Sequence, residues 1–298
     1  MSGNLGTTDV AVYPSRESVV GRIPVHRALP RRGLRTVGPW CFADHMGPEP
    51  VTETKGLDIG PHPHTGLHTV TWLLEGAVLH RDSLGTEQLI RPGQLNLMTA
   101  GHGVAHAEEA SDTYRGTLHG VQLWVAQPDT HRDGTPGFEH HAVLPRAEVD
   151  HSELTVLVGE FAGARSLARQ DSPIVGADAA VRAGRTTWPL RPDFEYALLV
   201  LDGEISVGQH VVRPHALAAF GTGRAEVSVT VRDTARVLLL GGAPFTEPLI
   251  MWWNFVARTH DEIDAAVRAW QEHEERFGRV ASSLARIPAP QPVWAPRG

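Results

Sequence analysis

Short apolar runs rich in β-branched residues, broken every few positions by Gly, Pro or Asp, dominate the chain from residue 17 to about 127. Clear examples are 69–74, 89–90, 94–98 and 118–125, and the stretch shows little helical periodicity. Many short strands with regular turn signals are typical of a β-sandwich or barrel. The pattern therefore predicts an all-β first unit.

A second strand-rich block has the same character. Its apolar runs are 155–161, 196–201, 204–207, 216–220 and 225–240. The Asp-Gly turn after residue 201 matches the Glu-Gly turn after residue 74, which indicates a duplicated fold.

The pattern changes after Gly242. Thr259 and Glu262 form a capping box, and apolar residues then recur at helical spacing up to Phe277, with Gly278 as a stop signal. From Ile287 onward the chain is too rich in proline for regular structure, so we expect a disordered tail or a wrapping arm. We predict an N-terminal barrel over 1–130, a linker over 131–150, a second barrel over 151–245, and a helix with a Pro-rich tail over 246–298.

Composition and charge limit which partners and which cellular compartment we expect for this chain. The chain has 298 residues, a formal charge of −7 and a pI near 6.2, which argues against direct nucleic-acid binding because that requires a basic face. Cys41 is the only cysteine and lies in a strand-like apolar run, so no intramolecular disulfide is possible. The sequence shows neither a signal-peptide pattern nor a membrane-spanning apolar run. We therefore expect a cytoplasmic protein without a membrane partner.

Two short pairs of residues carry the strongest chemical signal. His62 and His64 are two residues apart, as are His106 and Glu108, and residues at that spacing on a strand share one face. Two such strands inside a barrel would surround one ion with three imidazoles and a carboxylate. This set suits a divalent ion such as iron, nickel, copper, zinc or manganese. Because the chain has 17 histidines, the alternative is that these are structural or surface histidines.

The order of the motifs resembles the cupins, and more narrowly the pirin family. The residues that carry the resemblance are His62-Pro-His64-Thr-Gly66, Leu73-Leu-Glu-Gly76, Met98-Thr-Ala-Gly101, Gly103-Val-Ala-His106-Ala-Glu108, Gly120-Val-Gln-Leu-Trp124, Gly242-Ala-Pro-Phe-Thr-Glu-Pro248 and Asn254-Phe-Val. The resemblance implies two jelly-roll barrels in tandem, with one metal ion in the first, and iron(II) is the expected metal. The second block reads Arg191-Pro-Asp-Phe-Glu195 where a His-x-His pair would stand, so we predict that its barrel lacks a metal site.

The resemblance also implies a function. Pirin-like proteins are associated with quercetin 2,3-dioxygenase activity, so the expected partners are a phenolic substrate and O₂. Glu108 would take the proton of the substrate hydroxyl as general base. A different function is a redox-sensitive, iron-containing regulator that binds a protein partner. A zinc-dependent sugar isomerase is a third, weaker possibility, because it leaves the ends of the chain unexplained. We expect a monomer.

Other residues near these motifs have open roles. His68 stands where many cupins have a glutamate ligand, and its parity with His62 and His64 would place it inside the barrel, although Gly66 makes that parity unreliable. Trp72 and Trp124 either line a flat pocket or fill the core, and core filling is the expectation.

Overall fold

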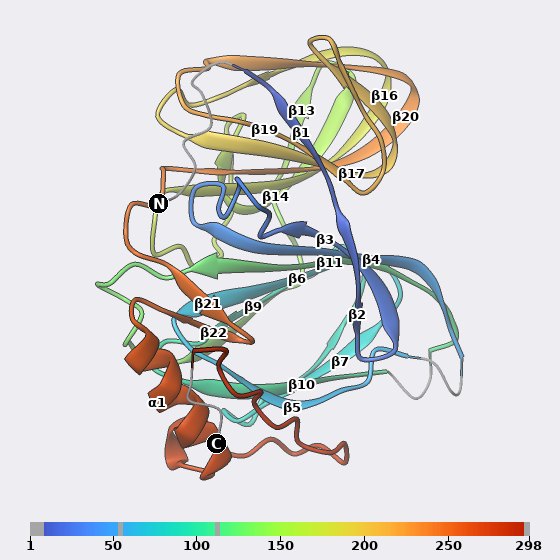
Figure 1. Ribbon diagram of the computed structural model, residues 1–298. Helices are drawn as coiled ribbons and strands as arrows, with labels where there is room; N and C mark the ends of the chain where they lie inside the picture. The colour runs from blue at the N-terminus through green and yellow to red at the C-terminus, as the bar shows by residue number, and fades with distance from the viewer. Residues whose placement is uncertain (1–8, 53–55, 111–113, 295–298) are drawn as a thin grey trace.

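Two β-barrels lie one on the other, with a helix from the C-terminal part of the chain at the far side of the first barrel (Figure 1). The computed structural model describes residues 9–52, 56–110 and 114–294. The predicted all-β fold with two cupin barrels and a C-terminal helix is confirmed.

The first barrel consists of a seven-stranded sheet that faces a four-stranded sheet. The strand order is β12-β9-β6-β11-β4-β3-β2 in the larger sheet and β5-β10-β7-β8 in the smaller one. The strands are β2 (Arg16–Val20), β3 (Ile23–Leu29), β4 (Trp40–Val51), β5 (Ile59–His64), β6 (Leu67–Glu75), β7 (Val78–Asp82), β8 (Glu87–Ile90), β9 (Leu95–Thr99), β10 (Val104–Ala110), β11 (Gly116–Ala126) and β12 (Gly137–His141).

The second barrel is one curled sheet of nine strands whose interior is filled by apolar side chains. Trp188, Tyr196 and Phe220 are among the buried residues that pack inside it. Its strands are β1 (Ala11–Pro14), β13 (Arg146–Val149), β14 (Ser152–Phe161), β15 (Ala164–Arg165), β16 (Ile174–Pro189), β17 (Glu195–Val207), β18 (His210–Val212), β19 (Ala216–Phe220) and β20 (Glu226–Gly242).

The segment after residue 242 contains a hairpin and the predicted helix. The hairpin strands are β21 (Ile250–Trp252) and β22 (Phe255–Ala257). Helix α1 (His260–Gln271) begins as predicted, because the Thr259 hydroxyl accepts a hydrogen bond from the Glu262 amide at 3.2 Å. It ends before the expected stop: Gly278 instead closes a short 3₁₀ helix, η1 (Glu275–Phe277). Among the described residues, no helix is long and apolar enough to cross a membrane.

Strand pairing corrects two of the expected boundaries. The predicted linker over 131–150 contains two strands, since β12 pairs with β9 of the first barrel and β13 pairs with β14 of the second. The sequence of β12, Gly-Phe-Glu-His-His, does not alternate between apolar and polar residues. In the structure all five residues are half-buried, so neither face of the strand requires an apolar set. The N-terminal β1 pairs with β19, so it belongs to the second barrel although it precedes the first along the chain (Figure 1).

The outer face of the seven-stranded sheet packs against the second barrel through a shared apolar core. Buried polar contacts cross this interface as well. The Trp72 indole donates to Asp178 at 2.8 Å, and Asp178 also pairs with Arg236 of β20. Trp72 therefore fills core between the barrels, as expected. These contacts fix the strands of the first barrel from behind.

Histidines form a chain across the same interface. His45 of β4 lies with its Nδ1 3.1 Å from His215 Nδ1 and its Nε2 2.8 Å from His119 Nε2. His26 stacks on His215 with ring centroids 3.6 Å apart. Burial, and then the neighbouring histidines, lower the pKa of His45 to about 3. Neutral imidazoles can share hydrogen bonds along such a chain, whereas imidazolium ions would repel one another.

This chain predicts that acid weakens the contact between the barrels. His45 has a folded-state pKa below its unfolded value near 6.5, so its contribution to stability is complete above pH 6.5 and is lost as the pH falls below it. We expect the melting temperature of the metal-free protein to fall between pH 7.5 and pH 5.5. In His45→Gln the fall should be smaller by at least about 3 °C. Differential scanning calorimetry measures this, and equal falls in both proteins would contradict it.

Candidate metal centre

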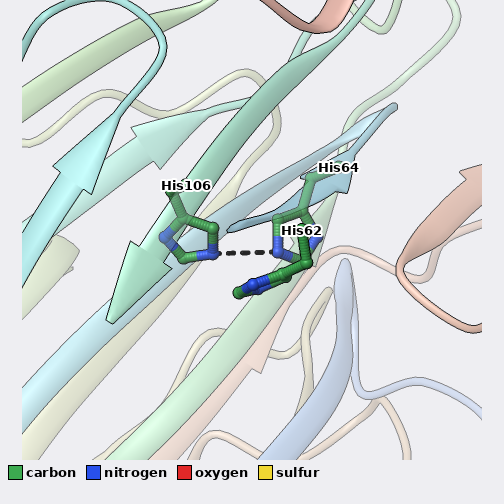
Figure 2. Close-up of side chains that lie close together, drawn as sticks. All are labelled: His62, His64 and His106. Carbon is green, nitrogen blue, oxygen red and sulfur yellow. Dashed lines mark hydrogen bonds between the residues drawn. The ribbon is translucent and has the colours of Figure 1, made fainter. Parts of the chain in front are cut away.

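Antiparallel pairing of β5 with β10 brings three histidines together. His106 lies directly opposite His62, and His64 follows two residues later on the same face of β5. One ring nitrogen from each of His62, His64 and His106 lies within 4.8 Å of the other two, and all three side chains are buried. Figure 2 shows the three rings converging on one point.

Each of the three imidazoles is held at its Nδ1 atom. His62 Nδ1 lies 2.9 Å from the Gly60 carbonyl oxygen, and His64 Nδ1 lies 3.1 Å from that of Asn254. His106 Nδ1 lies 3.3 Å from His80 Nδ1. A carbonyl oxygen can only accept, so the Nδ1 atoms of His62 and His64 carry the proton and their Nε2 atoms have free lone pairs. This arrangement is typical of histidines that bind a metal.

The spacing of the free nitrogens fits an ion. His64 Nε2 and His106 Nε2 are 3.1 Å apart, the contact drawn as a dashed line in Figure 2. Two nitrogens bound at about 2.1 Å to one ion at a right angle are about 3 Å apart. Burial lowers the pKa of His62 to about 4 and those of His64 and His106 well below the usual value. All three rings are therefore neutral near pH 7, which is the form that binds a metal.

Glu108 lies in the same pocket but is not a member of the three-histidine group. The pairing of β10 with β5 is irregular between His106 and Glu108, so the two side chains do not follow simple strand alternation. The Glu108 carboxylate is buried, and its Oε1 atom has no hydrogen-bond partner among the described residues. Burial raises the pKa of Glu108 to about 7, against a smaller opposing effect of the Thr71 hydroxyl. That Glu108 joins the three histidines as a fourth metal ligand remains a prediction.

A hydrogen-bonded series leads from His106 to a turn on the far side of β7. His80 Nε2 lies 3.2 Å from Asp82 Oδ2, while Asp82 Oδ1 accepts from the amides of Leu84 and Thr86 at 2.9 Å each. When His80 donates a hydrogen bond from its Nε2–H to Asp82, its Nδ1 atom has a free lone pair. That Nδ1 atom can then accept a hydrogen bond from the Nδ1–H of His106. The Asp82–His80 pair then fixes which nitrogen of His106 faces the centre.

The C-terminal segment supports β5 from outside. The Ile287 amide donates to the Pro61 carbonyl at 2.9 Å, and a Cβ atom at Gly60 would lie only 2.0 Å from the Ala285 carbonyl oxygen. The Pro-rich tail is thus a wrapping arm over its described part, up to residue 294. Any side chain at Gly60 would push this arm away from the strand that carries His62 and His64.

A pocket of about 350 Å³ opens beside the three histidines. One wall is formed by the histidines and Glu108, and the opposite wall by inward-facing residues of the seven-stranded sheet. Trp124 stacks on Phe42 with ring centroids 4.1 Å apart and meets His64 edge-on at 5.2 Å. Trp124 therefore lines the pocket, contrary to the expectation that it only fills core.

His68 lies away from this pocket. Gly66 adopts a positive φ of 68°, which breaks the alternation between β5 and β6 and turns His68 toward the second barrel. There its two ring nitrogens meet Thr99 Oγ1 at 3.0 Å and Asp171 Oδ2 at 2.9 Å. The supporting roles of His80, Asp82 and Asn254 were not predicted. The only sequence signal for His80 and Asp82 is the alternation of β7, and it does not reveal which strand lies beside it. Asn254 begins a motif that contributed only to the family resemblance.

Comparisons with known proteins agree with this architecture. Residues 22–125 match the sequence profile of Pirin, and residues 177–278 match that of the Pirin C-terminal cupin domain. A Pseudomonas aeruginosa protein provisionally named quercetin 2,3-dioxygenase is 47% identical over 276 residues, which is 92% of this chain and 87% of that protein. A pirin-like protein of Caulobacter vibrioides is 35% identical over 87% of this chain and 92% of its own length. The crystal structure of quercetin 2,3-dioxygenase from Acinetobacter baumannii superposes with a TM-score of 0.93 at 44% identity, covering 97% of each chain.

The Asp82–His80 pair predicts a loss of metal affinity in His80→Gln. Without an imidazole behind it, His106 can rotate and can place its proton on Nε2, so we expect divalent-metal affinity to fall about 10- to 100-fold. Anaerobic titration with iron(II) and a competing chelator measures the change. His141→Gln is the control, since His141 pairs with Glu139 rather than with a member of the centre. Equal affinities in His80→Gln and the unaltered protein would contradict the role of His80.

Proposed function

The chain belongs to the pirin family, and on that premise we propose that it is a metal-dependent dioxygenase of the quercetin 2,3-dioxygenase type. Its substrate would be a flavonol or a similar phenolic, and O₂ would be the second substrate. The observation that carries the proposal is a buried carboxylate oxygen of Glu108 that has no hydrogen-bond partner in the described part of the chain and lies beside three neutral imidazoles at one wall of a pocket.

The donor set fits one divalent ion, which we take to be iron(II). His62, His64 and His106 would hold it through their Nε2 atoms, with Glu108 as the fourth ligand. When bound, such an ion acts as a Lewis acid toward the oxygen of a substrate hydroxyl and brings substrate and O₂ together. The Nε2 side of the three rings is the open side, because the Gly60 and Asn254 carbonyl oxygens and His80 hold the Nδ1 atoms.

Glu108 would accept the proton of the substrate hydroxyl. Burial raises the pKa of Glu108 to about 7 in the metal-free pocket. A bound divalent ion would lower that pKa, so the carboxylate would be ionised and able to accept a proton near pH 7. Its Oε1 atom meets no donor among the described residues, so a lone pair is free to receive that proton. A substrate hydroxyl at the centre would supply the donor that this buried oxygen lacks.

The pocket walls would orient a flat substrate and keep water out. The stacked rings of Trp124 and Phe42 form an apolar side next to His64. Trp253 and Ile287 line the pocket as well, and Trp253 has a positive φ of 51° at the tip of the β21–β22 hairpin. A bulky residue in that conformation is uncommon and stores strain. The same hairpin supplies the Asn254 carbonyl that orients His64.

Loss of the base should strongly reduce turnover, while the three histidines should retain the metal. We expect Glu108→Gln to lower the rate of quercetin-dependent oxygen uptake by at least about 100-fold in iron-loaded protein. Uptake is measured with an oxygen electrode, the ring-opened product by mass spectrometry, and bound iron in the same sample. Glu109→Gln is the matched control, because its neighbouring carboxylate pairs with Arg81 at 2.6 Å instead.

Quercetin-dependent oxygen uptake no greater than that of free iron would contradict the flavonol dioxygenase. Unchanged uptake in Glu108→Gln, with iron retained, would contradict the role of Glu108 alone.

A further inference from the structure

The pocket contains an ion pair that the proposed reaction does not use. Arg27 of β3 and Asp44 of β4 both line it. Arg27 Nε donates to Asp44 Oδ1 at 2.8 Å and Arg27 Nη2 donates to Asp44 Oδ2 at 2.7 Å. We propose that Arg27 is a specificity-determining residue that anchors an anionic oxygen on the part of the aromatic substrate remote from the reacting hydroxyl. This proposal rests on the proposed function of the pocket.

One edge of the Arg27 guanidinium remains free. Asp44 occupies Nε and Nη2, and Nη1 has no hydrogen-bond partner among the described residues. The Arg27 side chain is 21% exposed, whereas that of Asp44 is only 3% exposed. A ligand in the pocket therefore meets the guanidinium, and Asp44 serves to hold it in one orientation. Such a fixed donor loses little side-chain entropy when it binds an oxygen.

A continuous row of rings connects Arg27 with the metal centre. The Arg27 guanidinium lies over Phe42, with Cζ 4.6 Å from the ring centroid, and Phe42 stacks on Trp124 at 4.1 Å. Trp124 in turn meets His64 at 5.2 Å. A flat ligand lying along this row would have its reacting hydroxyl at the histidines and its opposite end at the guanidinium.

This geometry selects a chemical class of substrate. The apolar middle of the row favours an aromatic system, and the charged end favours a carboxylate or an ionised hydroxyl. A hydrogen bond to a charged group contributes at least about tenfold to affinity. An aromatic compound that lacks the remote anionic oxygen should therefore bind more weakly.

A pair of two-ring probes tests the anchor without requiring turnover. 6-Hydroxy-2-naphthoate carries a carboxylate at the end opposite its hydroxyl, and 2-naphthol has the same rings without it. Equilibrium binding of each to zinc-loaded protein is followed by probe fluorescence. We expect the unaltered protein to bind the naphthoate at least about tenfold more tightly than the naphthol, and Arg27→Met to abolish this preference.

The second barrel offers a matched control. There Arg191 pairs through Nε and Nη2 with Asp193 and lies over Phe194 at 4.2 Å, but it is exposed and far along the chain from the histidines. Arg191→Met should leave the preference unchanged. Because Arg27→Met leaves Asp44 without its partner, the double variant Arg27→Met/Asp44→Asn keeps the test valid if the single variant folds poorly.

The outcomes separate the anchor from the proposed reaction. A preference that survives in both Arg27 variants, or no binding of either probe to the unaltered protein, would overturn the anchor. Loss of the preference in both variants but not in Arg191→Met would support it. Neither outcome depends on quercetin or oxygen uptake, so a protein that binds the naphthoate through Arg27 but does not oxidise quercetin would contradict only the flavonol substrate.

Discussion

The pairing of β5 with β10 is the interaction on which the rest of the site depends. It places His106 opposite His62 although 44 positions separate them in the chain, and it leaves all three imidazoles buried on one face. Backbone carbonyls and His80 form hydrogen bonds with the three Nδ1 atoms. These bonds fix the orientation of each ring and therefore the direction of its Nε2 atom. The three imidazoles are therefore in place without an ion. The lone pairs of their Nε2 atoms repel one another, and a bound cation would attract all of them.

The second barrel is a single curled sheet that supports the first barrel. Its interior is filled with apolar side chains, while its outer face supports the seven-stranded sheet that forms the second wall of the pocket. The aromatic side of that wall, the Arg27–Asp44 pair and Gln122 all belong to strands of this sheet. Inter-barrel contacts such as Trp72 with Asp178 thus hold the substrate-facing wall without touching the pocket.

Much of this could be predicted from the sequence, because strand alternation and motif order are local properties. The alternating pairs gave His62, His64, His106 and Glu108 as one group, and the capping box gave the start of α1. Details that depend on pairing between distant strands could not be read in this way. The irregularity between His106 and Glu108 exists only in the register of β10 against β5. The position of His80 behind the centre likewise requires the pairing of β7 with β10.

We infer that His62, His64 and His106 bind one ion through their Nε2 atoms, on the side that faces the pocket. The most direct test is a crystal structure of protein loaded anaerobically with iron(II), with anomalous diffraction recorded at the iron edge. We expect one strong peak in each chain, about 2.1 Å from those three nitrogens. The absence of a peak there, or a peak at the His45–His119–His215 chain between the barrels instead, would contradict it.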